Sequence, residues 1–422
     1  MFIRSTGVCT DTRKIEQGNL FFALKGPAFD ANTFAANALA LGASAVVVDD
    51  PQCIKKSDQG YFLVEDGLKA LQDLALYHRR KLNIPILGIT GTNGKTTTKE
   101  LTHAVLGTKF NTVATQGNLN NHIGVPLTLL KMDTFTEFGI VEMGANKIGD
   151  IRELCEISEP THGLITNIGK AHLEGFGNFE GVLRTKTELY QYLLANGGRV
   201  FINTSNPLLA NMAKRFDDPI LYPGRDDFYP CNLVDANPFV RFQTRDGKIH
   251  STKILGAYNF ENIAASLTVG SFFGVNEEKA IQAVCGYIPS NMRSQLVEKR
   301  SNLILLDAYN ANPSSMEEAI TAFGKMSGKK HKMVILGDMF ELGSEEIEEH
   351  RKIGALVHPM KIDKVCFTGK LMQHGLETAP GALYFPDPFS LRNWLQDSNL
   401  EDYLILIKGS RGMKLEGLVD FI

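Results

Sequence analysis

Cysteine is scarce in this sequence, and no two cysteines lie close together in the chain. The six cysteines are spread over 422 residues and form no Cys-x-x-Cys pair, which is the spacing typical of zinc sites. Isolated buried thiols in a reducing compartment are the interpretation that fits this distribution. We therefore expect neither a zinc site nor a disulfide framework.

Long hydrophobic runs are also absent. No stretch approaches the ~18 consecutive apolar residues of a membrane-spanning helix. Residues 1–5 contain no apolar core of the length that a signal peptide has. The sequence thus predicts a cytoplasmic protein without a membrane span.

Neither sign of charge dominates the composition. The chain has 44 Lys and Arg against 47 Asp and Glu, for a net charge of −3. Nucleic-acid binding through bulk electrostatics requires a basic face, so we expect no nucleic-acid partner. A locally basic cleft for phosphates is compatible with this balance, and Arg13, Lys95 and Arg293 are candidates to line one. The length, at about 150 residues per domain, predicts two to three domains.

The most informative segment is an apolar run at residues 84–90 and the turn that follows it. The chain continues through a short glycine-containing loop into a helix predicted from Thr96 to about residue 106. Glycine lets backbone N–H groups converge on phosphate oxygens, and the start of a helix adds partial positive charge. Lys95 can reach the β- and γ-phosphates, and the Thr96 hydroxyl can ligate magnesium. The loop residues are Gly91, Thr92, Asn93, Gly94, Lys95, Thr96 and Thr97.

This loop departs from the eight-residue P-loop pattern at its first position. Ile89 stands where that pattern has glycine. The alternative is an ordinary strand-to-helix turn that happens to contain a lysine. The strand, turn and helix context together favour a site for ATP or GTP.

Strands and helices alternate along the chain, which favours mainly parallel sheets covered by helices. We expect three α/β domains: a small one over residues 1–82, a central one with the phosphate loop over 83–296, and a third over 297–422. A β-hairpin is expected within residues 239–254. Expected strands include residues 20–24, 45–48, 138–141, 164–166, 199–202, 303–307, 333–336, 365–367 and 404–407, and expected helices include 33–41, 68–80 and 259–273.

Polar residues follow several of these strands, at the edge where open α/β sheets bind ligands. Glu142 is placed to hold magnesium there, with a solvated surface glutamate as the alternative. His172 follows another strand, where a structural histidine and a ligand both remain open. Lys186, from its own context, is interpreted as a lysine on an exposed helix. Asp307 closes a buried strand, and the segment 408–411 either binds an anion or simply ends the last strand.

Taken together, these motifs resemble the Mur ligases of peptidoglycan synthesis, over all three expected domains. The segments 307–313 and 336–343 are most similar to the branch that adds D-alanyl-D-alanine to UDP-N-acetylmuramoyl-tripeptide. Residues 11–13 and 18–26 are similar to the uridine-binding domain that this branch shares with the MurE branch. The motifs shared more widely are residues 90–97, 118–126, 142–145 and 167–174.

The resemblance implies an ATP-dependent ligase with a uridine-binding first domain and a Rossmann-like third domain. The terminal carboxylate of the UDP-linked tripeptide would be phosphorylated by ATP, and the amine of D-alanyl-D-alanine would attack the acyl phosphate. ATP and two magnesium ions are the implied cofactors, the two peptide substrates are the implied partners, and a monomer is expected.

The resemblance also implies a role for individual residues. Lys95 and the loop amides would hold the ATP phosphates, and Thr96 with Glu142 would hold one magnesium. Glu142, His172 and Lys186 would serve a second magnesium, because the family converts the matching lysine to a carbamate, an anionic oxygen donor suited to a hard cation. The remaining implied contacts are Asn262 to adenine, Arg293 to phosphates, Asp307 to ribose, Thr12 and Arg13 to the uridine nucleotide, and Asn118 and Asn310 to substrate.

Two departures from the family and three alternatives accompany this interpretation. Tyr258 stands where the family often has histidine, and Asn291-Met292-Arg293 lacks the usual glycine. Another ligase of the superfamily such as MurE is one alternative, but its Asp-Asn-Pro-Arg run is absent. Folylpolyglutamate synthetase lacks a uridine-binding first domain. A nucleotide-switched regulatory protein would have a guanine-reading Asn-Lys-x-Asp motif, which we do not find.

Overall fold

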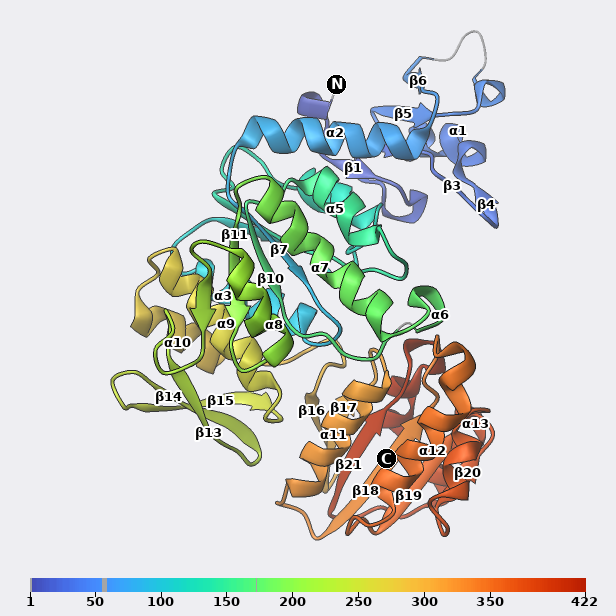
Figure 1. Cartoon of the computed structure of the whole chain (residues 1–422). Helices are drawn as coiled ribbons and strands as arrows, with labels where there is room; N and C mark the ends of the chain where they lie inside the picture. The colour runs from blue at the N-terminus through green and yellow to red at the C-terminus, as the bar shows by residue number, and fades with distance from the viewer. Residues whose placement is uncertain (1, 55–58, 172) are drawn as a thin grey trace.

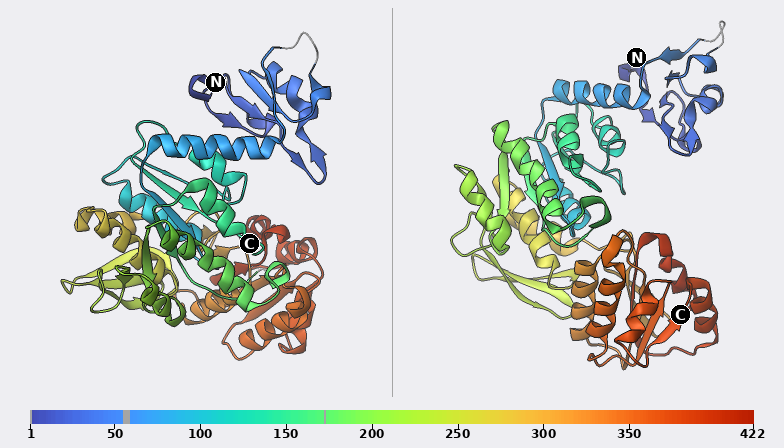
Figure 2. Two further views of the ribbon diagram at one scale, coloured as in Figure 1. Left: turned by 45° about the horizontal axis from the view of Figure 1, so that its top comes forward. Right: turned by 45° about the vertical axis from the view of Figure 1, so that its right-hand side comes forward.

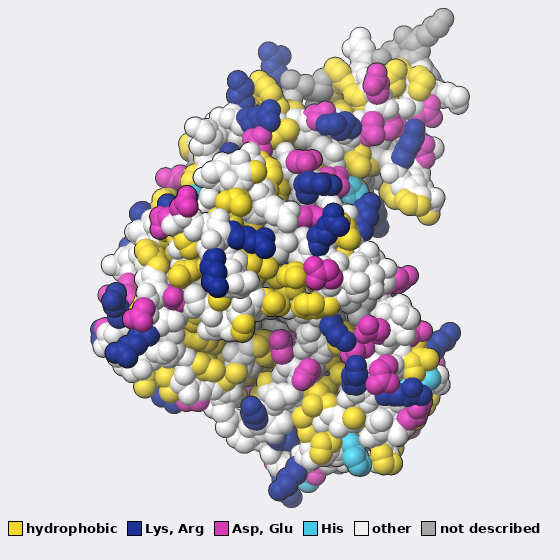
Figure 3. All heavy atoms as spheres, viewed as in Figure 1, with side chains coloured by type: hydrophobic (Ala, Val, Ile, Leu, Met, Phe, Trp, Pro, Cys, Tyr) yellow, Lys and Arg dark blue, Asp and Glu magenta, His cyan; other side chains and the backbone are white. Residues whose placement is uncertain are grey.

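The computed structural model describes residues 2–54, 59–171 and 173–422, with only the backbone of Leu173. Three α/β domains follow one another along the chain (Figure 1), which confirms the expected fold class. Figure 3 shows that the surface is hollowed between the first and the last domain. Among the described helices, none combines the length and apolar character that a bilayer crossing needs.

The first domain is built on a four-stranded parallel sheet with the strand order β1-β2-β5-β6. Alternate residues of its strands face opposite sides. Phe21 and Val46 pack under helix α1, whereas Phe22 and Val47 face helix α2. The elements are β1 (Val8–Cys9), β2 (Leu20–Phe22), β3 (Lys25–Gly26), β4 (Phe29–Asp30), α1 (Ala35–Ala40), β5 (Ala45–Val48), β6 (Tyr61–Leu63) and α2 (Gly67–Leu82).

Helix α2 has clear signals at both ends. The Asp66 side chain accepts a hydrogen bond from the backbone N–H of Lys69, and Asn83 ends the helix in a left-handed conformation. Both further views place α2 across the junction between the first and the central domain (Figure 2). It belongs to one hydrophobic cluster with the first sheet and with the central domain.

The central domain contains a six-stranded parallel sheet with the order β12-β11-β10-β7-β9-β8. Helices α4, α5 and α7 cover one face, and α3 and α9 cover the other. The strands are β7 (Ile86–Thr90), β8 (Thr112–Ala114), β9 (Phe138–Glu142), β10 (His162–Ile165), β11 (Arg199–Asn203) and β12 (Ile220–Tyr222). The helices are α3 (Lys95–Leu106), α4 (Gly124–Leu129), α5 (Asp150–Ser158), α6 (Leu173–Phe176), α7 (Phe179–Ala195), α8 (Pro207–Met212), α9 (Asn259–Phe272) and α10 (Glu277–Gly286).

A separate antiparallel sheet lies beside the central one. The predicted hairpin is formed by β14 (Phe239–Thr244) and β15 (Ile249–Leu255), and it gains a third strand, β13 (Cys231–Ala236), that we did not predict. Only Cys231 of the six residues of β13 is buried, so its sequence shows little of the apolar alternation that identifies a half-buried strand.

The third domain is a doubly wound sheet with the order β16-β17-β21-β18-β19-β20, in which only the edge strand β16 is antiparallel. Helices α11 and α12 pack on one face and α13 packs on the other. The elements are β16 (Gln295–Lys299), β17 (Asn302–Asp307), α11 (Pro313–Lys325), β18 (His331–Gly337), α12 (Glu346–Val357), β19 (Lys364–Thr368), β20 (Leu383–Phe385), α13 (Pro388–Asp397) and β21 (Tyr403–Lys408).

The buried arginine Arg79 fastens α2 to the central domain. Its Nε donates to the carbonyl of Ser158 at 3.0 Å and its Nη2 to the carbonyl of Glu159 at 3.1 Å, at the C-terminal end of α5. These carbonyls have no partner within the helix, so the guanidinium caps them. The next residue, Arg80, is exposed and only pairs with the Glu159 side chain.

We therefore expect Arg79→Ala to lower the free energy of unfolding by about 2–4 kcal/mol, because it removes two charged hydrogen bonds and leaves carbonyl groups unpaired. The matched change Arg80→Ala breaks only a surface ion pair and should cost less than about 1 kcal/mol. Urea unfolding of the full chain, followed by circular dichroism, compares the two variants. Equal losses of stability would contradict the role of Arg79.

Candidate active site

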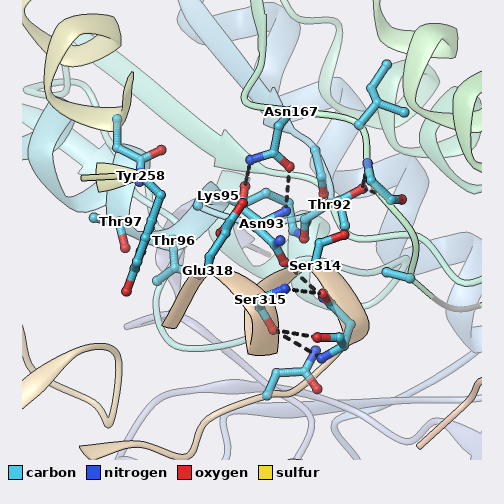
Figure 4. A pocket seen from close by; sticks show the side chains of 18 of the residues that line it. Thr92, Asn93, Lys95, Thr96, Thr97, Asn167, Tyr258, Ser314, Ser315 and Glu318 are labelled. Carbon is cyan, nitrogen blue, oxygen red and sulfur yellow. Dashed lines mark hydrogen bonds between the residues drawn. The ribbon is translucent and has the colours of Figure 1, made fainter. Parts of the chain in front are cut away.

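A polar cavity lies between the central and the third domain, at the carboxyl ends of their parallel strands. It has a volume of ≈ 490 Å³ and is lined by the loop after β7, the ends of β9 and β10, helix α7, and the start of α11. Figure 4 shows the loop residues beside Asn167 of the central domain and beside Ser314, Ser315 and Glu318 of the third. Ligands bind at this edge of open α/β sheets, so this cavity is the candidate active site.

Two positions of the phosphate loop require glycine. At each of them φ is positive, and a neighbouring side chain lies too close to leave room for a Cβ atom. Gly91 has a φ of +146°, and a Cβ there would lie 2.0 Å from Thr166 Oγ1. Gly94 has a φ of +77°, and a Cβ there would lie 2.5 Å from Asn262 Oδ1. Helix α3 begins at the next residue, Lys95, so the strand, turn and helix lie where the sequence predicts them. This is the backbone that cradles phosphate in nucleotide-binding proteins.

The turn after β10 braces this loop. The backbone N–H of Thr92 donates to the carbonyl of Asn167 at 3.0 Å, and that of Asn93 donates to Asn167 Oδ1 at 2.9 Å. Thr92 Oγ1 in turn accepts from the N–H of Gly169 at 2.9 Å. The loop is therefore held by hydrogen bonds before any nucleotide enters.

Lys95 lies half-buried in the cavity wall, and among the described residues no carboxylate forms an ion pair with it. Its Nζ donates to the carbonyl of Gly91 at 2.7 Å and to that of Thr92 at 2.9 Å. Burial lowers the pKa of Lys95 to about 8, the charge of Arg293 lowers it further, and Glu142 opposes both. A cation held on carbonyl dipoles alone is available for phosphate.

Glu142, Thr96 and Asn120 form a compact polar group at the end of β9. Thr96 Oγ1 donates to Glu142 Oε2 at 2.9 Å, and Asn120 Nδ2 donates to Glu142 Oε1 at 2.8 Å. Both Thr96 and Glu142 are buried, which excludes the alternative of a solvated surface glutamate.

This donor set fits magnesium. Magnesium in nucleotide sites keeps several waters and takes one or two carboxylates together with substrate phosphates, so one carboxylate and one hydroxyl beside a phosphate loop suffice. Within the described residues, no three His, Cys, Asp or Glu side chains gather into a metal site of their own. His172, the other expected ligand, lies outside the described residues.

Lys186 is buried in the cavity wall, so its interpretation as a lysine on an exposed helix is wrong. It lies on the inner face of α7, between the buried residues Val182 and Leu189. Its side chain is 2% exposed, and its Nζ lies 5.8 Å from the centre of the Phe176 ring. Burial lowers the pKa of Lys186 well below its usual value, and the charge of Lys95 adds to this effect. The sequence near Lys186 contains the charged residues Arg184 and Glu188. This local sequence is typical of an exposed helix and gave no sign that Lys186 is buried.

Three expected nucleotide-binding residues line the other side of the cavity. Asn262 Oδ1 accepts from Thr98 Oγ1 at 3.0 Å. The Arg293 guanidinium lies 3.8 Å from the centre of the Tyr309 ring, a cation–π contact. Asp307 pairs with Lys408 at 2.6 Å.

The two departures from the family pattern also lie here. Tyr258, at the position of the usual histidine, lines the cavity, and its hydroxyl is 2.9 Å from Ser294 Oγ. Asn291, which precedes the arginine segment, has a φ of +58°, a left-handed conformation that asparagine tolerates better than most residues.

Sequence reasoning missed several residues of the cavity. Asn120 lies inside a recognised motif but was not singled out. Asn312 caps α11 and reaches across the domain boundary, where its Nδ2 donates to Asn93 Oδ1 at 2.9 Å. Asn167 accepts the hydrogen bonds from Thr92 and Asn93 that hold the phosphate loop. Glu318 also lines the cavity, and burial raises its pKa to about 7. The Asn-Pro pair at 312–313 was a usable helix-start signal, whereas nothing in the sequence around Glu318 marks it.

The expected substrate residues are spread over two places. Asn310 lines the cavity, but Asn118 is exposed and does not. Thr12 and Arg13 lie in the first domain, where exposed Arg13 pairs with Asp11 at 2.8 Å. The structure thus brings together the loop, Glu142, Lys186 and the nucleotide-side residues, and leaves the uridine-side residues on a separate domain.

Comparisons with known proteins agree with this arrangement in every domain. The family model described as "Mur ligase family, catalytic domain" matches residues 4–79, the "Mur ligase middle domain" matches 89–270, and the "Mur ligase, glutamate ligase domain" matches 292–411. The UDP-N-acetylmuramoyl-tripeptide--D-alanyl-D-alanine ligase of Bacillus subtilis is 38% identical over 98% of this chain and 92% of its own. The protein of the same name from Escherichia coli is 34% identical with the same coverage.

Solved structures of Mur ligases are also similar to this chain. MurF from Acinetobacter baumannii superposes with a TM-score of 0.87 at 29% identity, over 98% of this chain and 92% of its own. MurF ligase from Thermotoga maritima in complex with ADP superposes with a TM-score of 0.86 at 26% identity, over 100% and 97%. Because the similarity extends through all three domains in both sequence and structure, the chain belongs to the Mur ligase family.

Proposed function

We propose that this protein joins D-alanyl-D-alanine to the terminal carboxylate of UDP-N-acetylmuramoyl-tripeptide, with hydrolysis of ATP to ADP and phosphate. One observation carries the proposal: the phosphate loop, Glu142 and Lys186 meet in one cavity that the third domain closes. The relatives that carry this activity in their names match nearly the whole chain, so every domain that the reaction needs is present.

The first step is phosphoryl transfer. The loop amides and Lys95 hold the triphosphate, with Lys95 leaving the carbonyls of Gly91 and Thr92 for the phosphate oxygens. A carboxylate oxygen of the tripeptide attacks the γ-phosphorus in line, the bond to the β-phosphate oxygen breaks, and ADP leaves. The charged groups around the loop offset the negative charge that spreads over the transferring group.

Thr96 and Glu142 would hold one magnesium ion, and Glu142, His172 and a modified Lys186 would hold a second. When bound, these ions neutralise phosphate charge and orient the γ-phosphate. The chain's own contribution is to hold the Glu142 carboxylate between Thr96 and Asn120, so that both of its oxygens point in fixed directions.

The second step is acyl transfer. The neutral amine of D-alanyl-D-alanine attacks the acyl carbon and forms a tetrahedral oxyanion. Phosphate then leaves, and the amine loses a proton as the amide forms. Cationic groups around the former γ-phosphate, Lys95 among them, stabilise the oxyanion.

We propose that Lys186 acts as a carbamate. A neutral amine adds to carbon dioxide and releases one proton, which leaves an anionic group with two oxygens. The burial that lowers the pKa of Lys186 supplies the neutral amine that this reaction needs. The product would add a second anionic oxygen donor to the cavity that Glu142 lines.

The first domain, which we assign to residues 1–82, would hold the uridine nucleotide through Thr12 and Arg13. Residues 83–296 would form the ATP domain and residues 297–422 the third. Asn118 and Asn310 would contact the peptide substrate, and Asn262, Arg293 and Asp307 would contact adenine, phosphates and ribose. We further propose that the protein works as a monomer in the cytoplasm.

The decisive assay measures phosphate release with purified protein. We expect release that requires ATP, UDP-N-acetylmuramoyl-tripeptide and D-alanyl-D-alanine together, because the acyl phosphate forms only on the peptide carboxylate. Single amino acids replace the dipeptide as the control for another ligase of the family. Steady ATP turnover with neither peptide present, or a single amino acid accepted in preference to D-alanyl-D-alanine, would contradict the proposal.

Lys186→Ala should lower kcat at least a hundredfold, because it removes the anionic ligand, and added formate or acetate should restore part of the activity. Carbon-13 NMR of the native protein in labelled bicarbonate should show a carbamate signal that the variant lacks. Arg184→Ala, on the exposed face of the same helix, is the control and should leave kcat unchanged. An unaltered rate in Lys186→Ala would exclude the assigned role.

ATP binding should weaken as the pH rises above about 8, where Lys95 loses its proton. Calorimetric titration between pH 7 and 9.5 should show an affinity that approaches a tenfold loss per pH unit. Unfolding of the protein caused by deprotonation of Lys95 would not explain this loss of ATP affinity. A lysine with a lowered folded pKa binds fewer protons than the unfolded chain between pH ~8 and ~10.5, so its contribution to stability rises with pH. An ATP affinity that stays constant to pH 9.5 would contradict the prediction.

A further inference from the structure

A second cavity lies within the first domain, away from the phosphate loop. It has a volume of ≈ 560 Å³ and opens between the inner face of the four-stranded sheet and helix α2. Leu20, Phe22 and Val47 form its floor, and Ala70 and Leu74 of α2 form its roof. Leu20 and Phe22 belong to the segment 18–26 that resembles a uridine-binding domain, but Thr12 and Arg13, the two residues assigned to the uridine nucleotide, do not line this cavity.

Helix α2 packs on the first sheet and is also held by the central domain. Arg79 bonds to carbonyls of α5, and Gln72 Nε2 reaches the carbonyl of His122 and a carboxylate oxygen of Glu153, each at 3.2 Å. At about 1.5 Å per residue the 16-residue helix is roughly 24 Å long, whereas the strands below it have two to four residues. A helix fixed to the central domain therefore spans beyond the small sheet and does not close down on all of it.

The lining is almost entirely apolar, with one cation at its edge. Ile3, Tyr77 and Phe62 line the cavity and are 93%, 60% and 43% exposed, so they stand at its opening. Lys81 is the one fully charged side chain among the described lining residues, and its Nζ lies 5.4 Å from the centre of the Tyr77 ring. The ring of His78 also lines the cavity, but its Nε2 is bonded to the carbonyl of Met132 at 2.7 Å.

The size of the cavity, its apolar lining and the lysine at its rim indicate which kind of ligand it would bind. A cavity of this size lies within the range of small-molecule sites, about 300–1,000 Å³. Ordered water needs two to four polar partners, which a floor of Leu20, Phe22 and Val47 does not provide. A lysine whose stem runs along apolar surface presents its ammonium group to an anion at the rim. The chemistry is therefore that of an amphiphile with an apolar body and a negative end.

We propose that this cavity binds a single aliphatic chain that carries an anionic headgroup, with the chain between the sheet and α2 and the headgroup at Lys81. The source is either a free long-chain carboxylate or a lipid that gives up one chain to the cavity. The site is separate from the ATP cavity, so the inference holds independently of the proposed ligase reaction.

The first test uses monomeric alkyl carboxylates of eight, ten and twelve carbons, each below its micelle concentration, titrated calorimetrically into the full-length protein. Affinity should rise about fourfold per methylene added, the factor that burial of one CH₂ gives. The heat capacity change should be negative, as burial of apolar surface requires. No binding of the twelve-carbon chain, or an affinity independent of chain length, would overturn the proposal.

Two pairs of variants locate the bound chain. Ala70→Phe fills the cavity and should weaken binding at least tenfold, whereas Ala36→Phe makes the same change on exposed α1, over the opposite face of the sheet, and should not. Lys81→Gln should weaken binding of the carboxylate but not of the matching alcohol. Lys69→Gln, on the same helix outside the lining, should change neither. Binding that Ala70→Phe leaves intact in a folded variant would overturn the site.

Vesicles containing phosphatidylglycerol separate the two sources. Sedimentation with vesicles that is lost in Ala70→Phe would identify a membrane lipid as the source, and monomer binding without such sedimentation would identify a free chain. Sedimentation with vesicles but no binding of monomeric chains would mean adsorption of the exposed apolar rim, and would overturn the proposal.

Discussion

The site depends on the hydrogen bonds between two neighbouring loops of the central sheet. The loop after β7 donates to Asn167 through Thr92 and Asn93, and the turn after β10 donates back through Gly169. These bonds hold the main-chain amides in place, and Lys95 forms no ion pair with an acidic side chain in the part of the chain that the structure describes. If the loop were held by an ion pair instead, the pair would have to break before a phosphate could bind. Neutral hydrogen bonds fix the backbone without using the charge that the reaction needs.

Burial determines the electrostatics around that loop. Lys95 and Lys186 both lie in the wall of one cavity, and the charge of Lys95 lowers the pKa of Lys186 further. Two ammonium groups near one another in the wall of a cavity are unfavourable. Conversion of one amine to an anionic carbamate would turn this repulsion into attraction and would balance the charge of the second magnesium ion that we propose. The same burial that makes Lys186 a poor ammonium group makes it a good carbamate former.

Much of the fold could be predicted from the sequence. The main buried parallel strands, such as β7 and β17, carry continuous apolar runs, and each was located to within a few residues. Strands with exposed or short sequences, such as β13 and β16, were missed because they lack that periodicity.

For the site, the loop at 91–97 was found from its own residues, because its glycines are tied to backbone geometry. Lys186 was found only through resemblance to a family, since its burial depends on how α7 packs. Glu318 and Asn312 were missed because the third domain brings them to the cavity from more than 200 positions away, and local sequence does not record such proximity.

Helix α2 also affects where the boundary between the first and the central domain should be drawn. The inner face of the first sheet, α2 and one face of the central sheet belong to a single hydrophobic cluster, although sequence similarity divides the chain just after this helix. A hybrid ligase that exchanges the first domain should therefore be joined before Asp66 and keep the recipient's own helix. A junction at residue 83 would import a helix whose far side was shaped for a different partner.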